Sequence, residues 1–473
     1  MSKLYVFGIG GTGSRVLRAA TMLLASGLEC KADAIVPIII DPDAAAGDLE
    51  RTVDLMKKYG EVRSNLNFDS TRENKFFKTD IQQTTTNFRL PLSNTRDVKF
   101  DEYMGVSGMN NANQALVNML FSKNNLNSDM TIGFKGNPNI GSVVLNQFDN
   151  SDEFRNFTNE FTEQDKIFII SSIFGGTGAS GFPLLLKTLR TSASIANKQL
   201  VNNAHIGAIT VLPYFKVKQN DNSQIDSTTF VSKAKSALAY YDRAISRNNS
   251  IDNLYYVADD DTPTPYENCD GGINQKNNAH FVELISALAL INFANSQKPA
   301  ATVHKEFGIE IDTKNIIFEN LGQVTKQELR KPMTQFLLFA KYLNENDNFL
   351  SLPWTKDRSL DKTLFDGDFI RTLKKIQQEY VIWLTEMSAQ ERAFTPFNLH
   401  KDKDKVFDLV KGIKPRVVRN AMGIPIADSN YDLFNNRLNL QSGESKSGKK
   451  EQQFMELFYL ATQQLVKEKF NIE

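Results

Sequence analysis

The sequence predicts an α/β protein: a doubly wound, mostly parallel sheet followed by a mainly helical C-terminal region. Three observations support this class. Short apolar, β-branched runs recur through the first half of the chain, helix-like stretches lie between them, and from about residue 323 the pattern becomes helical. Strands and helices that alternate in this way are typical of a parallel sheet with helices on both faces.

The strand-like runs are continuously apolar, which is typical of strands covered on both faces. They occupy residues 4–7, 35–40, 167–170, 206–212 and 254–257. Helices are expected between them at 14–26, 183–196 and 232–245. In sheets of this class, the loops that follow the strands meet at the carboxyl edge, where ligands bind.

We expect two regions in the 473-residue chain. Residues 1–300 form the sheet domain, with an insertion at about 50–130 that is rich in Asn, Ser, Thr and Lys. Residues 301–473 form the helical region, in which the clearest amphipathic runs are 326–346, 364–387 and 451–470. The polar, glycine-containing stretch 442–450 is typical of an exposed loop.

The composition excludes several classes of function. The 55 basic residues balance the 55 acidic ones, so nothing indicates a nucleic-acid partner. Cys30 and Cys269 are the only cysteines, which excludes a disulfide framework and favours the cytoplasm. No apolar run approaches the roughly 18 residues that a membrane helix needs, and the N-terminus enters a strand almost at once.

The first candidate binding loop, 8–14, follows the first strand and opens a helix. In such a loop, backbone N–H groups and the positive end of the helix face a phosphate, and glycine lets the ligand approach closely. Alone it predicts a nucleotide without distinguishing a dinucleotide, an adenylate or a guanylate. A tight turn without a ligand is the remaining alternative, and the absence of a Lys-Ser or Lys-Thr pair excludes a Walker loop. The candidate residues are Gly10, Gly11, Thr12 and Ser14.

A second glycine loop, 174–181, also lies between a predicted strand and a predicted helix. Two phosphate-type loops in one sheet weaken the prediction of a simple dinucleotide-binding enzyme, which needs only one. Thr177 and Ser180 would add hydroxyl donors to the backbone amides. The candidate residues are Gly175, Gly176, Thr177, Gly178 and Ser180.

Several loops, in this order, resemble the tubulin/FtsZ superfamily. The opening GIGGTGS is similar to the first glycine loop of that family, and IIIDPDA at 38–44 to its acidic loop. GFKGNPNIG at 133–141 resembles the FtsZ loop that approaches the γ-phosphate, and GGTG at 175–178 carries most of the tubulin signature. The resemblance covers roughly residues 3–296, with a central helix expected at about 278–295. No single motif is decisive, but their order is.

The resemblance implies GTP or GDP as the ligand, with Mg²⁺ held near the phosphates by Asp41 and Asp43. An Asp-Pro-Asp turn that caps the next helix is the alternative reading of these two acids. The family's γ-phosphate loop maps onto Gly136 and Asn137, with Lys135 beside them. The base pocket maps onto the start of the central helix, where Asn277, Asn278 and His280 are the candidates, although His280 also fits an ordinary half-buried histidine.

The sequence departs from the family where hydrolysis is triggered. The stretch 315–321 resembles the loop after the central helix, but both of its acids are lost, to Ile317 and Asn320. Glu319 and Asn320 are the candidate catalytic residues that remain, with Glu310 or Asp312 as substitutes. Hydrolysis needs a well-placed group to orient water, so we expect turnover that is weak or depends on a partner.

Three functions remain open. The leading one is a GTP-dependent assembly or switch protein that associates with itself through its nucleotide-binding face, with filaments and further protein partners as extensions. The second is a Rossmann-type adenylating or dinucleotide-dependent enzyme. The third is a nucleotide-stabilised scaffold without turnover, in a bacterial multiprotein system such as a defence system.

Overall fold

The chain folds around a seven-stranded, all-parallel sheet in the order β3-β2-β1-β4-β5-β7-β9. The computed structural model describes residues 2–131, 133–134, 136–218, 227–259, 264–267, 269, 271–307, 313–356, 360–399, 405–427, 431–442 and 448–473. The strands are β1 (Lys3–Ile9), β2 (Ala34–Ile40), β3 (Asp80–Ile81), β4 (Lys166–Ser172), β5 (His205–Val211), β7 (Asn253–Val257) and β9 (Val303–Phe307). The predicted fold class is confirmed, and all five predicted strands belong to this sheet.

The two strands that the sequence did not reveal, β3 and β9, lie at the edges of the sheet. β3 is two residues long and falls inside the segment predicted as an insertion. β9 has the sequence VHKEF, which lacks a continuous apolar run because an edge strand is partly solvated. Apolar patterning therefore finds the buried centre of the sheet and misses its edges.

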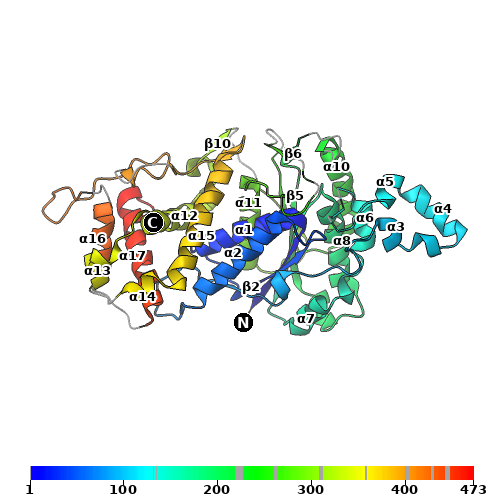
Figure 1. Ribbon diagram of the computed structural model, residues 1–473, viewed down its shortest axis with the longest axis horizontal. Coiled ribbons are helices and arrows are strands. Elements are labelled where there is room, and N and C mark those ends of the chain that lie inside the picture. Colours follow the sequence, from blue (N-terminus) through cyan, green and yellow to red (C-terminus); the bar gives the residue numbers. More distant parts are fainter. Residues whose placement is uncertain are drawn as a thin grey trace.

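Helices cover both faces of the sheet (Figure 1). On one face, α1 (Gly10–Ala25) packs beside α2 (Gly47–Arg63) and α11 (Phe281–Asn295). A side chain at Gly13 of α1 would overlap the backbone of Gly8, so this helix lies unusually close to β1. The other face carries α7 (Asp152–Glu160) and α8 (Gly176–Thr191), which contact Phe7 and Ile9 of β1.

The segment 50–130 is only partly an insertion. Its first part forms α2 and β3, which belong to the sheet domain. The part that projects from the body lies at the end of the molecule opposite the C-terminal helices (Figure 1). It consists of α3 (Phe100–Tyr103), α4 (Asn111–Leu120) and α5 (Lys123–Leu126), and α6 (Pro138–Val144) leads from it back to α8.

On the far side of α1 and α2 lies the C-terminal helical region (Figure 1). Its core is aromatic, with Phe339 and Tyr342 packed against Phe458. The helices are α12 (Gln323–Glu345), α13 (Pro353–Lys356), α14 (Lys362–Phe365), α15 (Asp368–Ser388), α16 (Asp432–Ser442) and α17 (Lys450–Phe470). A short parallel pair, β10 (Asn315–Ile316) and β11 (Ala393–Phe394), is its sheet component among the described residues. The predicted mainly helical region is confirmed.

Smaller elements of the sheet domain lie beside the main sheet. α9 (Lys198–Asn202) precedes β5, and α10 (Phe230–Tyr241) lies between β6 (Phe215–Val217) and β8 (Thr264–Tyr266), which pair with each other. Within the described ranges, none of the helices is both long and apolar enough to cross a bilayer.

Candidate functional site

The two glycine loops meet at the carboxyl edge of the sheet. They follow β1 and β4, which are adjacent and parallel. Gly10 has a φ of +69°, a conformation that favours glycine, and a Cβ placed on it would lie 3.4 Å from the Cβ of Thr177. The two loops are therefore in contact with each other.

Both helices that start at these loops lack a side-chain cap. Neither the residue before α1 (Ile9) nor the one before α8 (Gly175) accepts a hydrogen bond from its helix through a side chain, and neither first turn carries an acidic residue. The first N–H groups of a helix have no partner inside the helix. Two positive helix ends with uncapped N–H groups thus converge, which is the arrangement that binds phosphate.

A third loop, which leads into α6, closes against the start of α8. A Cβ on Gly176 would lie 3.0 Å from the backbone N of Asn137 and 3.3 Å from that of Gly136. Lys233 of α10 reaches the same loop, and its Nζ donates to the carbonyl of Gly136 at 2.9 Å. Lys135 lies outside the described residues. Gly136 and Asn137 therefore lie against the start of the second glycine loop.

The hydroxyl groups behave differently from the prediction. Ser180 is 2% exposed, and its Oγ donates to the carbonyl of Gly176 within α8 at 2.7 Å. Ser14 is fully buried. Thr12 accepts a hydrogen bond from Arg15 at 3.4 Å. Of the four predicted hydroxyls, the half-buried Thr177, beside Gly10, is the one placed to meet a ligand.

Asp41 and Asp43 form a turn at the end of β2, beside the first glycine loop. The backbone N–H of Asp43 donates to Asp41 Oδ1 at 3.0 Å. Both carboxylate oxygens of Asp43 accept backbone N–H groups, from Ala45 at 3.1 Å and from Gly272 at 2.6 Å. Asp43 is thus engaged in the alternative turn role, and only Asp41 fits a magnesium ligand. Among the described residues, no group of three or more His, Cys, Asp or Glu side chains forms a metal site.

Burial raises the pKa of Asp41 from 3.8 to about 7. Between these two values the folded protein keeps a proton that the unfolded chain releases, so this group lowers stability as the pH rises from about 4 to 7. A bound cation would favour the ionised form.

We therefore expect Asp41→Asn, which keeps the acceptor for Asp43 but cannot ionise, to stabilise the ligand-free protein. The shift of about three pKa units corresponds to a gain of about 4 kcal/mol at pH 8 and a smaller one at pH 5. Thermal melting of both proteins at the two pH values measures it. An equal difference in stability between the two proteins at both pH values would show that Asp41 does not titrate in this range.

The sequence analysis missed a buried ionic network centred on Arg15. This guanidinium is 5% exposed and donates to Glu283 Oε1 of α11 at 2.6 Å, to Tyr214 Oη at 2.8 Å and to Asp48 Oδ2 of α2 at 3.1 Å. Burial alone lowers the pKa of Arg15, but Tyr214 and the two carboxylates raise it well above its ordinary value. The available signal is an arginine in the predicted helix 14–26, whose other residues are mostly apolar.

A second set of ion pairs ties the C-terminal region to the same helices. Glu386 of α15 accepts from Arg18 at 2.6 Å and from Arg51 at 3.1 Å, and also from the backbone N of Ala279 at 2.9 Å. Arg51 in turn pairs with Asp48 at 2.8 Å. The start of α11 and the helices α1 and α2 are therefore linked to the helical region through Glu386.

The predicted base-pocket residues lie at the start of α11 with different surroundings. Asn278 is exposed, and its carbonyl accepts from Tyr266 Oη at 2.9 Å. The carbonyl of Asn277 accepts from Arg51, and its N–H faces Asp48. His280 is fully buried and caps α11 through Nδ1, which accepts from Val282 at 3.1 Å. Burial, with Arg15 and Arg392 nearby, lowers the pKa of His280 to about 3, so its imidazole is neutral.

Glu319 and Asn320 lie away from the end of α11. Strand β9 follows that helix, so the stretch 315–321 is not the loop directly after it, which differs from the expectation. Glu319 pairs with Lys326 at 2.9 Å and with Arg330 at 3.3 Å, and Asn320 Oδ1 accepts from the N–H of Ile317 at 2.8 Å. Glu319 is thus paired with α12, and Asn320 holds the short turn that precedes this helix. Glu310 and Asp312 lie outside the described residues.

The fold defines a doubly wound α/β protein in which two glycine loops meet at the carboxyl edge of the sheet. No family model and no curated protein matches the chain. Among solved structures, an empty FtsZ dimer from M. jannaschii is 16% identical, with a TM-score of 0.29, and the match covers 62% of this chain and 53% of that one. CetZ1 from Haloferax volcanii, a GDP-bound monomer, is 15% identical with a TM-score of 0.31, and the match covers 62% of this chain and 61% of that one. CetZ2 from the same organism, a GTPγS-bound protofilament, is 13% identical with a TM-score of 0.30, and the match covers 62% of this chain and 58% of that one. The chain thus spans less than two thirds of each of these proteins.

Proposed function

We propose that the protein binds a guanine nucleotide at the carboxyl edge of its sheet, with the phosphates between the first turns of α1 and α8. The observation that carries this proposal is the meeting of two uncapped helix N-termini, at Gly10 and Gly175. The backbone of Gly11, Gly176 and Gly178 supplies N–H donors in the first turns. Gly136 and Asn137 close the site on one side, and Thr177 supplies a hydroxyl.

The choice of guanine rests on the resemblance of the ordered loops to the tubulin/FtsZ superfamily. In this proposal Mg²⁺ is held by Asp41 together with phosphate oxygens and water, because Mg²⁺ is commonly bound through one or two carboxylates. When bound, the ion neutralises phosphate charge. Asn278, at the exposed start of α11, is the proposed contact to the base.

A dinucleotide-dependent or adenylating enzyme is the second candidate. The strand order favours it, because the same doubly wound order around the first strand occurs in dinucleotide-binding folds. The second glycine loop, after β4, argues against this candidate, because one such loop is sufficient to bind the diphosphate of a dinucleotide. The ligand therefore decides between the two candidates.

Titration calorimetry with GTPγS and Mg²⁺, in parallel with ATPγS and NAD, tests the proposal. We expect one saturable site for GTPγS and at least tenfold weaker binding of the other two, a difference of about 1.4 kcal/mol or more. Tighter binding of NAD or ATPγS would favour the enzyme instead. Absence of binding by all three would refute the nucleotide site.

We further propose that bound nucleotide controls self-association through this face, in the cytoplasm, where the free thiols Cys30 and Cys269 remain reduced. Turnover is expected to be weak, because Glu319 is paired with Lys326 of α12 and Asn320 is bonded within the turn that precedes this helix. A scaffold without turnover, working beside other proteins, is the limiting case.

Sedimentation velocity with and without GTPγS measures the association. We expect a nucleotide-dependent rise in the sedimentation coefficient with protein concentration. An unchanged monomer in both conditions would refute nucleotide-controlled self-association while leaving nucleotide binding untouched.

A further inference from the structure

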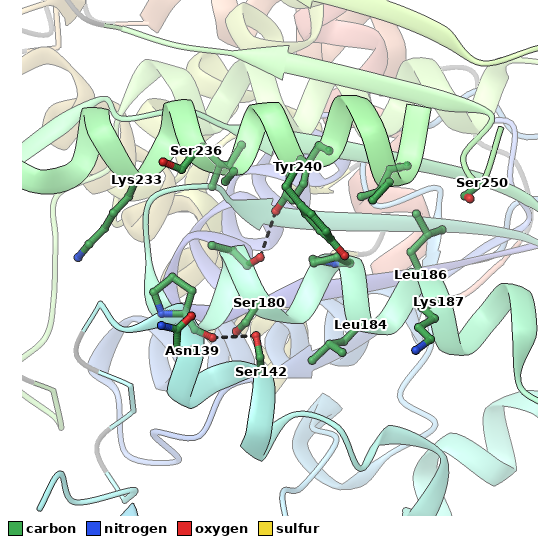
Figure 2. Close-up of a pocket in the computed structure, with 18 of the residues that line it drawn as sticks. Asn139, Ser142, Ser180, Leu184, Leu186, Lys187, Lys233, Ser236, Tyr240 and Ser250 are labelled. Carbon is green, nitrogen blue, oxygen red and sulfur yellow. Dashed lines mark hydrogen bonds between the residues drawn. The ribbon is translucent and has the colours of Figure 1, made fainter. Parts of the chain in front are cut away.

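A cavity of about 830 Å³ lies between α6, α8 and α10, beyond the contact of the two glycine loops (Figure 2). It begins beside Asn139 and Ser180 and extends along α8 as far as Thr191. Its volume is within the range of roughly 300–1,000 Å³ that small-molecule sites occupy. The proposed nucleotide site does not use this space, because the uncapped helix ends open at the edge of the sheet.

The walls of this groove are mainly apolar. Pro183, Leu184 and Leu186 of α8 face Ala237 and Tyr240 of α10 across it. Tyr240 is 49% exposed, and Figure 2 shows its ring extending from α10 into the cavity. These apolar side chains can pack against the apolar part of a ligand, and the tyrosine ring provides a flat surface for that contact.

The charge in the groove has one sign. Lys233 lies at one end and Lys187 toward the other (Figure 2), and Arg190 lines the same wall. No aspartate or glutamate is among the described residues that line the cavity. Asp252 offsets the charge of Arg190 at 3.0 Å, whereas the exposed Lys187 has no carboxylate partner in the described part of the chain. The groove therefore favours an anion.

We propose that this groove is a second binding site, for an amphipathic organic anion. An aromatic or aliphatic body would lie between Leu184 and Tyr240, and the acidic group would contact Lys187. The groove shares Ala179 and Ser180 with the second glycine loop at its near end, but the contacts proposed here, Leu184, Lys187 and Tyr240, are not part of the proposed nucleotide site. The inference is tested without nucleotide, so the two proposals fail separately.

The test uses a matched pair of probes, 8-anilinonaphthalene-1-sulfonate and the uncharged N-phenyl-1-naphthylamine, titrated into the full chain and followed by fluorescence. Three variants separate shape from charge. Ser236→Phe fills the groove from α10, and Lys187→Met removes the exposed cation. Lys235→Met removes an exposed cation of α10 that does not line the cavity and is the control. Thermal melting confirms that each variant is folded.

We expect one saturable site for each probe and at least tenfold weaker binding of both to Ser236→Phe. Lys187→Met should weaken the sulfonate about threefold, as an exposed charge contact does, and leave the uncharged probe unchanged. Lys235→Met should alter neither. Binding that survives in Ser236→Phe, or an equal loss in the two lysine variants, would overturn the proposal.

Discussion

Gly175→Asp is expected to weaken nucleotide binding at least a hundredfold while leaving the protein folded. Gly175 is the N-cap of α8, with φ −86° and ψ 169°, which any residue adopts. A Cβ there meets only the hydroxyl of Ser172, at 3.1 Å. Aspartate is a favourable N-cap, so its carboxylate would occupy the uncapped N–H groups and repel the phosphates.

The matched control is Gly175→Asn, which has the same shape and no charge. We expect it to bind within about tenfold of the unchanged protein, because it competes for the N–H groups without repelling phosphate. Calorimetry with GTPγS measures both variants, and thermal melting checks their folding. Equal affinities for the two variants would show that no phosphate lies at the start of α8.

The second large effect is expected from Arg15→Met, which should lower the free energy of unfolding by about 3–5 kcal/mol. Methionine fills much of the space but leaves Glu283 and Asp48 buried without their shared cation. Asp48 keeps Arg51 at 2.8 Å, so the loss falls mainly on Glu283 at the start of α11. Urea denaturation measures the change.

The control is Arg155→Met, which removes a largely exposed arginine paired with Asp152 at 2.8 Å. Exposed pairs of this kind contribute about 0–1 kcal/mol. If Arg15→Met proves too unstable to purify, Glu283→Gln, which keeps the shape of its partner, provides a milder change in the same network. A loss below about 1 kcal/mol for either variant would show that the network does not stabilise the fold.

The centre of the sheet was predictable because buried parallel strands are continuously apolar. The edges of the sheet were not predictable. β9 is a short strand that contains His304, Lys305 and Glu306, and β3 has only two residues. The segment 50–130 looked like an insertion because its polar composition hides α2, whose buried face packs on α1.

The candidate site was predictable as far as backbone chemistry determines it. Gly10 and Gly176 come together because the adjacent parallel strands β1 and β4 deliver their loops to one edge of the sheet. Gly136 lies before α6 and joins them through its contact with Gly176. Side-chain roles were less predictable, because they depend on partners that are distant in sequence. Asp43 is held by Gly272, and Arg15 by Glu283, which lies 268 positions away.

The central claim is that the carboxyl edge of the sheet holds a guanine nucleotide. The most direct measurement incubates the protein with an equimolar mixture of GTP, ATP and NAD in Mg²⁺, removes free ligand, denatures the protein and identifies the retained nucleotide by chromatography. We predict a guanine nucleotide at about one per chain, with loss of retention in Gly175→Asp and not in Gly175→Asn. Retention of an adenine nucleotide or of NAD, or of no nucleotide, would contradict the claim.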